Sequence, residues 1–224
     1  MKLSLHHVTV LGRKPQRTFD FYVKKLGFDL VWEGTCQDNE ATPQHDFKLP
    51  YDDVLLTFHF YPRCHKGEKG CGLFGGLVLG LPGRDWKKEL GRFYRGRGRE
   101  NGRHIVVDPD GLQIEIEETE APGVLGLQVP CPEVSKEKEF WRGFPGLVGG
   151  GHSLNFMKCE GSGVLGYGSI HHGAVLCEDL VGLAESSPAR ATRWGVSSYI
   201  HSPSDVLIER VSLPAGVQPF GRPE

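Results

Sequence analysis

The sequence lacks the features that would place it in a membrane. Among its 224 residues no apolar run approaches the roughly 20 residues of a membrane helix. The opening residues, MKLSLHHVTV, lack the apolar core of a signal peptide. We therefore expect a folded domain from the N-terminus onward and a cytoplasmic protein. The net charge of −2 supplies no general attraction for nucleic acid or an anionic membrane, so neither is expected as a partner.

The sequence lacks a recognisable pattern of cysteine pairing. None of the six cysteines forms a C-x-x-C motif. A chain of this length needs no disulfide framework to stabilise its core. Cys64, His65 and Cys71 lie close together, but no second pair of ligands follows at the spacing of a structural zinc site. The sequence therefore favours free thiols in a reducing compartment over a zinc site.

Glycine is abundant, at 31 residues, and short apolar segments alternate with turns along the whole chain. This pattern favours an α+β fold that is rich in strands. The first 60 or so residues predict a strand, a helix that begins near Pro15 and ends at Gly27, and three further strands. The expected strands span 3–11, 28–34, 45–49 and 54–61.

The same succession recurs from about residues 73, 123 and 168, which makes an internal repeat the main organisational feature. SLHHVTV at 4–10 parallels SIHHGAV at 169–175, and DPDGLQIEI at 108–116 parallels SPSDVLIER at 202–210. We therefore expect four βαβββ modules paired into two half-barrel sheets, with the helices outside. Residues 1–120 would form an N-terminal pair of modules and residues 121–224 a C-terminal pair.

The two His-His pairs and a glutamate in an apolar strand are the candidate metal ligands. They are His6 with His7, His171 with His172, and Glu209. Side chains alternate along a strand, so we expect only one His of each pair to face a given barrel. Two imidazoles and one carboxylate on one side of an ion form the facial triad typical of non-haem Fe(II). A cation would also offset the cost of burying the Glu209 carboxylate.

The repeat contains an internal control for this assignment. Glu115 is the counterpart of Glu209, since each lies six residues after a turn proline, Pro109 or Pro203. The second and third modules open with GLFGGLVLG and GVLGLQV, which contain no histidine. We therefore expect one barrel to hold a complete ligand set, and Glu115 to be a solvated or paired strand residue.

The chain resembles the vicinal oxygen chelate superfamily, which includes glyoxalases and extradiol dioxygenases, and within it the hydroquinone-type ring-cleaving dioxygenases. The similar stretches are LHHVTVLGRKPQRTFDFYVKKLGFDLV, VLLTFHFYPRCHKGEKGCG, GYGSIHHGAV and SYIHSPSDVLIERVSLPAGV. The resemblance implies that Fe(II), or else Mn(II) or another divalent ion, is held by three ligands: His7, His172 and Glu209. It also implies that His6 and His171 act next to the metal as acid–base groups, that Tyr199 lies in the pocket, and that Arg193 faces the substrate.

The implied reaction is the opening of a hydroquinone- or catechol-like ring with O₂, which makes a small aromatic compound and O₂ the expected partners. The chain departs from the family in its trimmed middle modules and in the SPSD turn, which replaces Pro-Gly-Gly. Two alternatives therefore stay open: another metal-dependent reaction of the glyoxalase type, either isomerisation or group transfer, and a non-catalytic protein that binds an aromatic ligand and confers resistance. A homodimer is also left open.

Overall fold

The computed structural model describes residues 2–37, 39–50, 52–98, 102–143, 150–177, 187–192 and 194–214. Its three α-helices are α1 (Pro15–Phe21), α2 (Trp86–Leu90) and α3 (Val134–Arg142). Within these residues no helix is long and apolar enough to cross a membrane. The strands are β1 (Lys2–Leu3), β2 (Leu5–Gly12), β3 (Asp29–Cys36), β4 (Asn39–Lys48), β5 (Leu55–Phe60), β6 (Gly76–Leu81), β7 (Tyr94–Arg97), β8 (His104–Val107), β9 (Gln113–Glu118), β10 (Gly123–Cys131), β11 (His152–Lys158), β12 (Ser169–Leu176), β13 (Arg190–Thr192), β14 (Gly195–His201) and β15 (Leu207–Ser212).

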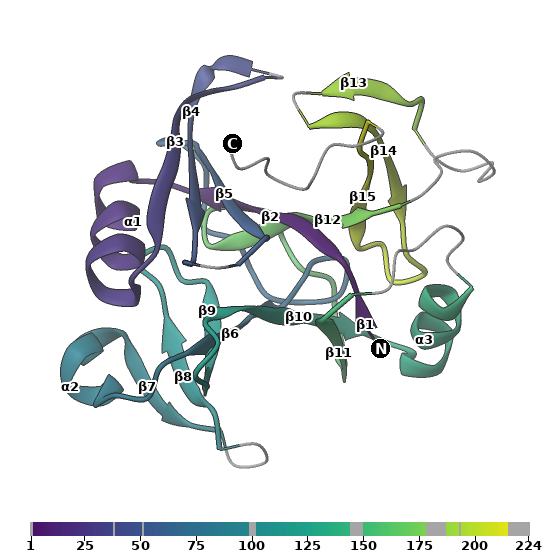
Figure 1. Cartoon of the computed structure of the whole chain (residues 1–224). Coiled ribbons are helices and arrows are strands. Elements are labelled where there is room, and N and C mark those ends of the chain that lie inside the picture. The colour runs from purple at the N-terminus through teal and green to yellow at the C-terminus, as the bar shows by residue number, and fades with distance from the viewer. Residues whose placement is uncertain are drawn as a thin grey trace.

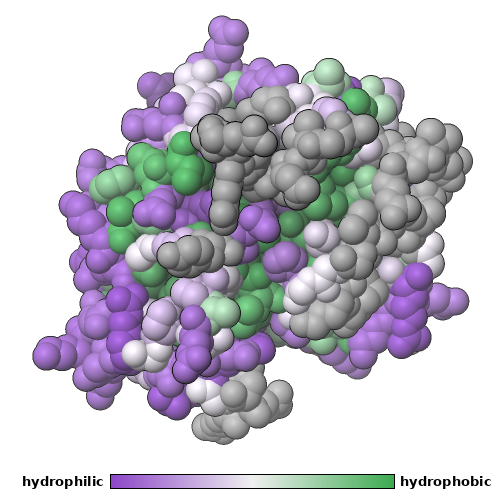
Figure 2. Space-filling model, viewed as in Figure 1, coloured by the Kyte–Doolittle hydropathy of each residue, from purple (hydrophilic) through white to green (hydrophobic). Residues whose placement is uncertain are grey.

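The strands form two sheets, which confirms the expected α+β class with curved half-barrel sheets. One sheet has eight strands in the order β13-β14-β15-β12-β2-β5-β4-β3, and the other has seven in the order β1-β11-β10-β6-β9-β8-β7. The helices lie at the periphery of both sheets (Figure 1). The face seen in Figure 2 is hydrophilic along most of its margin, with apolar surface exposed nearer its centre.

Each sheet joins segments that are distant in the sequence. In the eight-stranded sheet β2 of the first module pairs antiparallel with β12 of the fourth. In the seven-stranded sheet β6 of the second module pairs antiparallel with β10 of the third. Hydrogen-bonded pairing therefore crosses residue 120 in both sheets, and the division into units 1–120 and 121–224 stays a prediction.

The third module is shorter than expected. The first two modules follow the predicted β-α-β-β-β order, whereas the described part of the third consists of β10, α3 and β11. The two-residue β1 pairs antiparallel with β11. This pair takes the place that the pair of β4 and β5 has in the first module. In this way the N-terminal residues cover a sheet edge that would otherwise present unpaired backbone groups. A helix in the fourth module would fall on residues 178–186, outside the described part of the chain.

The first helix confirms its sequence prediction at both ends. Pro15 is its first residue, where the fixed φ of proline suits a helix and its missing N–H costs nothing. A π-helical turn, Tyr22–Leu26, extends it to Gly27, which has a φ of 85°. Glycine takes that left-handed conformation without steric cost. The repeat predicts three strands after each helix, but no local pattern in the sequence marks the residues of β7, β11 or β13, and β7 falls in an arginine-rich segment.

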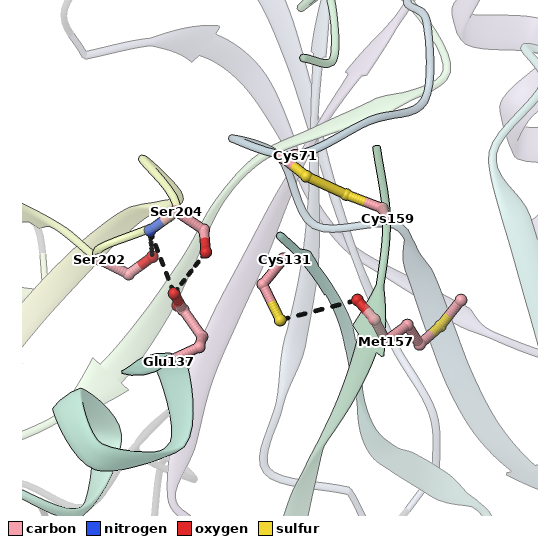
Figure 3. The surroundings of a disulfide bond; sticks show 7 residues. All are labelled: Cys71, Cys131, Glu137, Met157, Cys159, Ser202 and Ser204. Carbon is pink, nitrogen blue, oxygen red and sulfur yellow. Dashed lines mark hydrogen bonds between the residues drawn. A yellow bond between two sulfur atoms is a disulfide. The ribbon is translucent and has the colours of Figure 1, made fainter. Parts of the chain in front are cut away.

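A disulfide joins Cys71 to Cys159, so the expectation of free thiols is wrong for these two residues (Figure 3). The other four cysteines are free. The bond lies between residues 61–75 and 159–168, the segments that carry the chain from one sheet to the other. These connections also exchange backbone hydrogen bonds, such as Glu68 N–H to the Val164 carbonyl at 2.8 Å. The sequence could not show this pairing because 88 residues separate the two cysteines.

Candidate metal centre

The two His-His pairs lie on neighbouring strands, and each lies at a β-bulge. On β2, His7 pairs with Ala174 of β12 and Leu5 pairs with Val175 of β12, which leaves His6 as an extra, unpaired residue of the ladder. A bulge of this kind breaks the strict alternation of side chains and can turn a side chain towards a new direction.

The second bulge repeats the arrangement on β12. Here Ile170 pairs with Val10 of β2 and His172 pairs with Thr9 of β2, so His171 is the extra residue on β12. The first histidine of each pair therefore occupies the bulge, and the second returns to the regular ladder. The internal repeat of the sequence is thus reproduced in the backbone geometry around both pairs.

Within each pair the two imidazole rings touch. The Nδ1 atoms of His6 and His7 are 2.9 Å apart, and those of His171 and His172 are 2.8 Å apart. Rings on opposite faces of a strand could not approach so closely, so the bulges break the strict alternation of side chains. Only the second histidine of each pair lines the cavity at the centre, in line with the expectation that one member of each pair faces it. A hydrogen bond through Nδ1 fixes the orientation of each second histidine and leaves its Nε2 directed elsewhere.

Those two Nε2 atoms meet a single carboxylate oxygen. Oε2 of Glu209 lies 3.1 Å from Nε2 of His7 and 3.1 Å from Nε2 of His172, while the two nitrogens are 3.3 Å apart. All three residues are buried. Among the residues that the structure describes, this is the one cluster of His, Cys, Asp and Glu whose atoms converge tightly enough to hold an ion.

The spacing of the three atoms fits a shared metal ion. Ligands at right angles around an ion with bonds of about 2.1 Å lie about 3 Å from one another. Two imidazole nitrogens and one carboxylate oxygen on one side of the ion leave its opposite side open. Nδ1–H of His7 can donate to His6, and Nδ1–H of His172 to His171, so both Nε2 atoms keep a lone pair for the metal.

Electrostatics keep the site in the protonation state that metal binding needs. Burial alone would raise the pKa of Glu209, but the hydrogen bonds that His172 and His7 donate when Nε2 carries the proton outweigh it and hold the pKa far below its usual range. A bound metal would replace these Nε2 protons. Burial lowers the pKa of His172, which favours the neutral imidazole despite the nearby Glu209. Burial and the neighbouring His172 lower the pKa of His171 to about 4.

A cavity of about 60 Å³ lies against the three residues. Its wall includes Tyr199, as expected, whose ring centroid lies 5.4 Å from that of His172. Arg190 donates a hydrogen bond of 3.1 Å to the Tyr199 hydroxyl and also lines the cavity. Arg193, the arginine expected to face the substrate, is outside the described residues.

Several cavity residues escaped the sequence analysis. The Thr9 hydroxyl lies 3.0 Å from Nε2 of His172. Trp194 packs edge-on against His6 at 5.4 Å between ring centroids. Gln44, Thr57 and His59 come from the first module and form the wall nearest to β4 and β5. They follow no motif in the sequence, because only the pairing of β5 with β2, and of β4 with β5, brings them to the cavity.

The seven-stranded sheet contains the corresponding positions without the ligands. The strand registers place Gly126 where the other sheet has His7, and Gly76 where it has His172. Glu115 takes the position of Glu209, but its carboxylate accepts hydrogen bonds from Arg103 at 3.3 Å and from Gln128 at 2.7 Å. The prediction that Glu115 is a paired strand residue is confirmed.

The chain is similar in sequence to known proteins. Residues 4–79 match the Glyoxalase/Bleomycin resistance protein/Dioxygenase superfamily. The chain is 29% identical over 153 residues to a Bacillus subtilis protein named "Putative ring-cleaving dioxygenase MhqA", covering 62% of this chain and 48% of that protein. It is 30% identical over 92 residues to the similarly named MhqE, covering 39% of this chain and 30% of that protein. The chain thus spans half or less of the length of these curated relatives.

Solved structures show the same architecture. A crystal structure described as a putative dioxygenase from Bacillus subtilis superposes with a TM-score of 0.78 at 21% identity, covering 96% of this chain and 86% of that one. Glyoxalase I from Zea mays superposes with a TM-score of 0.72 at 12% identity, covering 93% of this chain and 92% of that one. At these identities the likeness establishes the fold, and the chemistry has to be argued from the site.

Proposed function

We propose that this protein is a non-haem Fe(II) ring-cleaving dioxygenase that opens a hydroquinone- or catechol-like aromatic ring with O₂. His7, His172 and Glu209 would hold the metal. The observation that carries the proposal is the approach of two Nε2 atoms and one carboxylate oxygen to within 3.1 to 3.3 Å of one another. The similarity to proteins named as ring-cleaving dioxygenases supports the choice of reaction.

When bound, Fe(II) would acidify the phenolic hydroxyl of the substrate and couple its oxidation to O₂. The protein residues have separate tasks. His171 stays neutral near pH 7 because of its lowered pKa. With its Nδ1 accepting from His172, its Nε2–H can donate a hydrogen bond to the substrate oxygen and take part in proton transfer there. Tyr199, held by Arg190, can donate a hydrogen bond to oxygen atoms on the substrate side of His172. His6 orients His7 through its ring nitrogen.

The test begins with protein purified without oxygen and loaded with Fe(II). We expect O₂ consumption with at least one member of a panel of dihydroxybenzenes, and about one iron per chain. The substitution His172→Ala should abolish both metal binding and O₂ consumption while the far-ultraviolet circular dichroism stays unchanged. Stoichiometric metal in His172→Ala would refute the ligand assignment.

The same assay separates the remaining alternatives. Turnover of a substrate with Zn(II) or Ni(II) and without O₂ would indicate an isomerase or transferase reaction instead. Tight binding of an aromatic compound without turnover, with or without metal, would indicate a binding or resistance protein. Either result would replace the dioxygenase proposal.

A further inference from the structure

The cavity at the metal centre is too small for an aromatic ring. It measures about 60 Å³, whereas benzene occupies an engineered protein cavity of about 150 Å³. The space beside His7, His172 and Glu209 is therefore sufficient for an ion and one or two small molecules. An aromatic substrate must place most of its ring in neighbouring space.

A second cavity of about 750 Å³ lies next to the first. His59 lines both cavities, and His171, whose Nδ1 contacts His172, lines the larger one. Leu11 on β2 also lines the larger cavity. Alternate residues of β2, namely His7, Thr9 and Leu11, therefore line a path from the metal centre to the larger cavity.

The neighbouring strand follows the same course. Thr57 pairs with Thr9, and His59 pairs with Leu11, in the parallel register of β2 with β5. Side chains two residues apart on a strand share a face. Two adjacent strands thus form one continuous wall from the small cavity to the large one, and a ligand can span both.

The lining of the large cavity is mainly apolar. Leu11, Tyr61, Pro62 and Leu165 are among its lining residues, and Arg63 is the one lysine or arginine side chain among the described residues that line it. No carboxylate is among those lining residues. A cavity of this size is within the range of sites that hold drug-sized ligands. It is far larger than an unsubstituted dihydroxybenzene needs.

We infer that the substrate of this site is an aromatic diol that carries an apolar substituent or a fused second ring. This inference rests on the proposed function. The hydroxylated edge of the ring faces the metal centre between His59 and His171, and the apolar part lies against Leu11, Tyr61 and Leu165. Burial of hydrocarbon in this cavity supplies the selectivity for such compounds.

Binding can be measured apart from turnover by using monophenols, which lack the second hydroxyl of a ring-cleavage substrate. Phenol and 4-hexylphenol are titrated into the metal-loaded protein by calorimetry without oxygen. Each buried methylene strengthens binding about fourfold, so partial burial of the chain should lower the Kd of 4-hexylphenol at least about 30-fold below that of phenol. Equal dissociation constants would overturn the inference.

Two substitutions locate the bound chain. Leu165→Asp places a charge in the large cavity, and Leu165→Trp fills part of it; each should reduce the preference for 4-hexylphenol by about tenfold or more. Val164→Asp is the matched control, because Val164 is the adjacent residue, is 41% exposed and lines neither cavity. An equal loss in the control and in the Leu165 variants would overturn the assignment of this cavity.

Oxygen uptake distinguishes the two proposals from each other. Hexylhydroquinone should give a higher kcat/KM than hydroquinone, mainly through a lower KM. Preferential binding of 4-hexylphenol with no O₂ uptake from either diol would refute the dioxygenase and keep the binding cavity. Uptake with equal kcat/KM for the two diols would keep the dioxygenase and refute the inferred substrate class.

Discussion

Nε2 of His7 and Nε2 of His172 lie 3.3 Å apart, although 165 residues separate them in the chain. They meet because β2 and β12 are antiparallel neighbours at the middle of the eight-stranded sheet. Glu209 joins them from β15, which pairs in parallel with β12. The candidate centre therefore depends on both ends of the described chain folding into one sheet.

Glu209→Gln should weaken divalent-metal binding at least about 100-fold, because an amide is a poor substitute for a carboxylate ligand. The measurement is metal content after equilibrium dialysis. Glu115→Gln is the matched control, since Glu115 takes the equivalent place in the other sheet and is bonded to Arg103 and Gln128. Equal metal loss in the two variants would contradict the assignment of Glu209.

Thr57→Glu should add a fourth protein ligand to the centre. Thr57 on β5 pairs with Thr9, which lies two residues after His7 on β2. In the same way, Glu209 on β15 pairs with Ala174, which lies two residues after His172 on β12. Thr57 therefore has the same place relative to His7 as Glu209 has relative to His172.

Thr57 is 3% exposed, lines the metal cavity, and its hydroxyl has no hydrogen-bond partner among the described residues. We expect the Thr57→Glu variant to bind metal at least as tightly as the original protein and to lose O₂ consumption by about 100-fold or more, because a position needed by substrate or O₂ is filled. Thr57→Val is the control that should retain both properties. Weaker metal binding in Thr57→Glu would contradict the predicted geometry.

Removing the Cys71–Cys159 bond should destabilise the fold by about 2 to 4 kcal/mol, since the bond closes a long loop in the unfolded chain. Urea unfolding of Cys71→Ser, and of the original protein with a dithiol reductant, measures the effect. Cys64→Ser changes a free cysteine on the same connection and should leave stability within about 0.5 kcal/mol. Unchanged stability on reduction would show that the bond contributes little.

Glu137→Ala should reduce the free energy of unfolding by about 3 kcal/mol or more, because it removes three hydrogen bonds to a buried charge. The Glu137 carboxylate accepts a bond from Trp141 Nε1 at 3.1 Å. It also accepts bonds from the Ser204 N–H at 3.1 Å and hydroxyl at 2.6 Å (Figure 3). Glu133→Ala, on an exposed side chain bonded to Lys136, should cost less than about 1 kcal/mol. Chemical denaturation of the two variants decides the comparison.

Asp108→Asn should remove a pH dependence of stability. Burial, and then the charge of Asp110, raise the pKa of Asp108 to about 7, while backbone N–H bonds act in the opposite direction. Between pH 4 and 7 the folded protein therefore holds a proton that the unfolded chain releases, so stability falls as pH rises, by about 1.4 kcal/mol per pH unit at most.

An asparagine at position 108 can still accept from the backbone through its oxygen and can donate to the Tyr22 oxygen, which lies 3.1 Å from Oδ2 of Asp108. Thermal unfolding measured from pH 4 to pH 8 should thus lose the part of the slope that is due to Asp108. Asp53→Asn, whose side chain is 80% exposed, should keep the original profile. The same slope in Asp108→Asn and in the original protein would contradict the raised pKa.

Much of this architecture is readable in one sequence because it depends on local patterns. Pro15 and Gly27 delimit the first helix through their own backbone preferences. The repeated His-His pairs and the Pro-x5-Glu spacing mark equivalent strands, so both pairs and Glu209 could be singled out before any contact was known. The choice of His7 and His172 within the pairs came from the resemblance to the vicinal oxygen chelate superfamily. The absence of histidine from the opening strands of the middle modules likewise predicted that Glu115 belongs to no complete ligand set.

Other features arise only when distant strands pair. The bulges at His6 and His171 depend on the register between β2 and β12, which no local pattern encodes. The Cys71–Cys159 bond and the placement of Thr57 and Arg190 around the cavity also require both sheets to be assembled. Local backbone preferences and repeat spacing thus determined the modules and the candidate ligands. Strand register and side-chain packing decided the shape of the cavity, because they act between segments that the sequence keeps far apart.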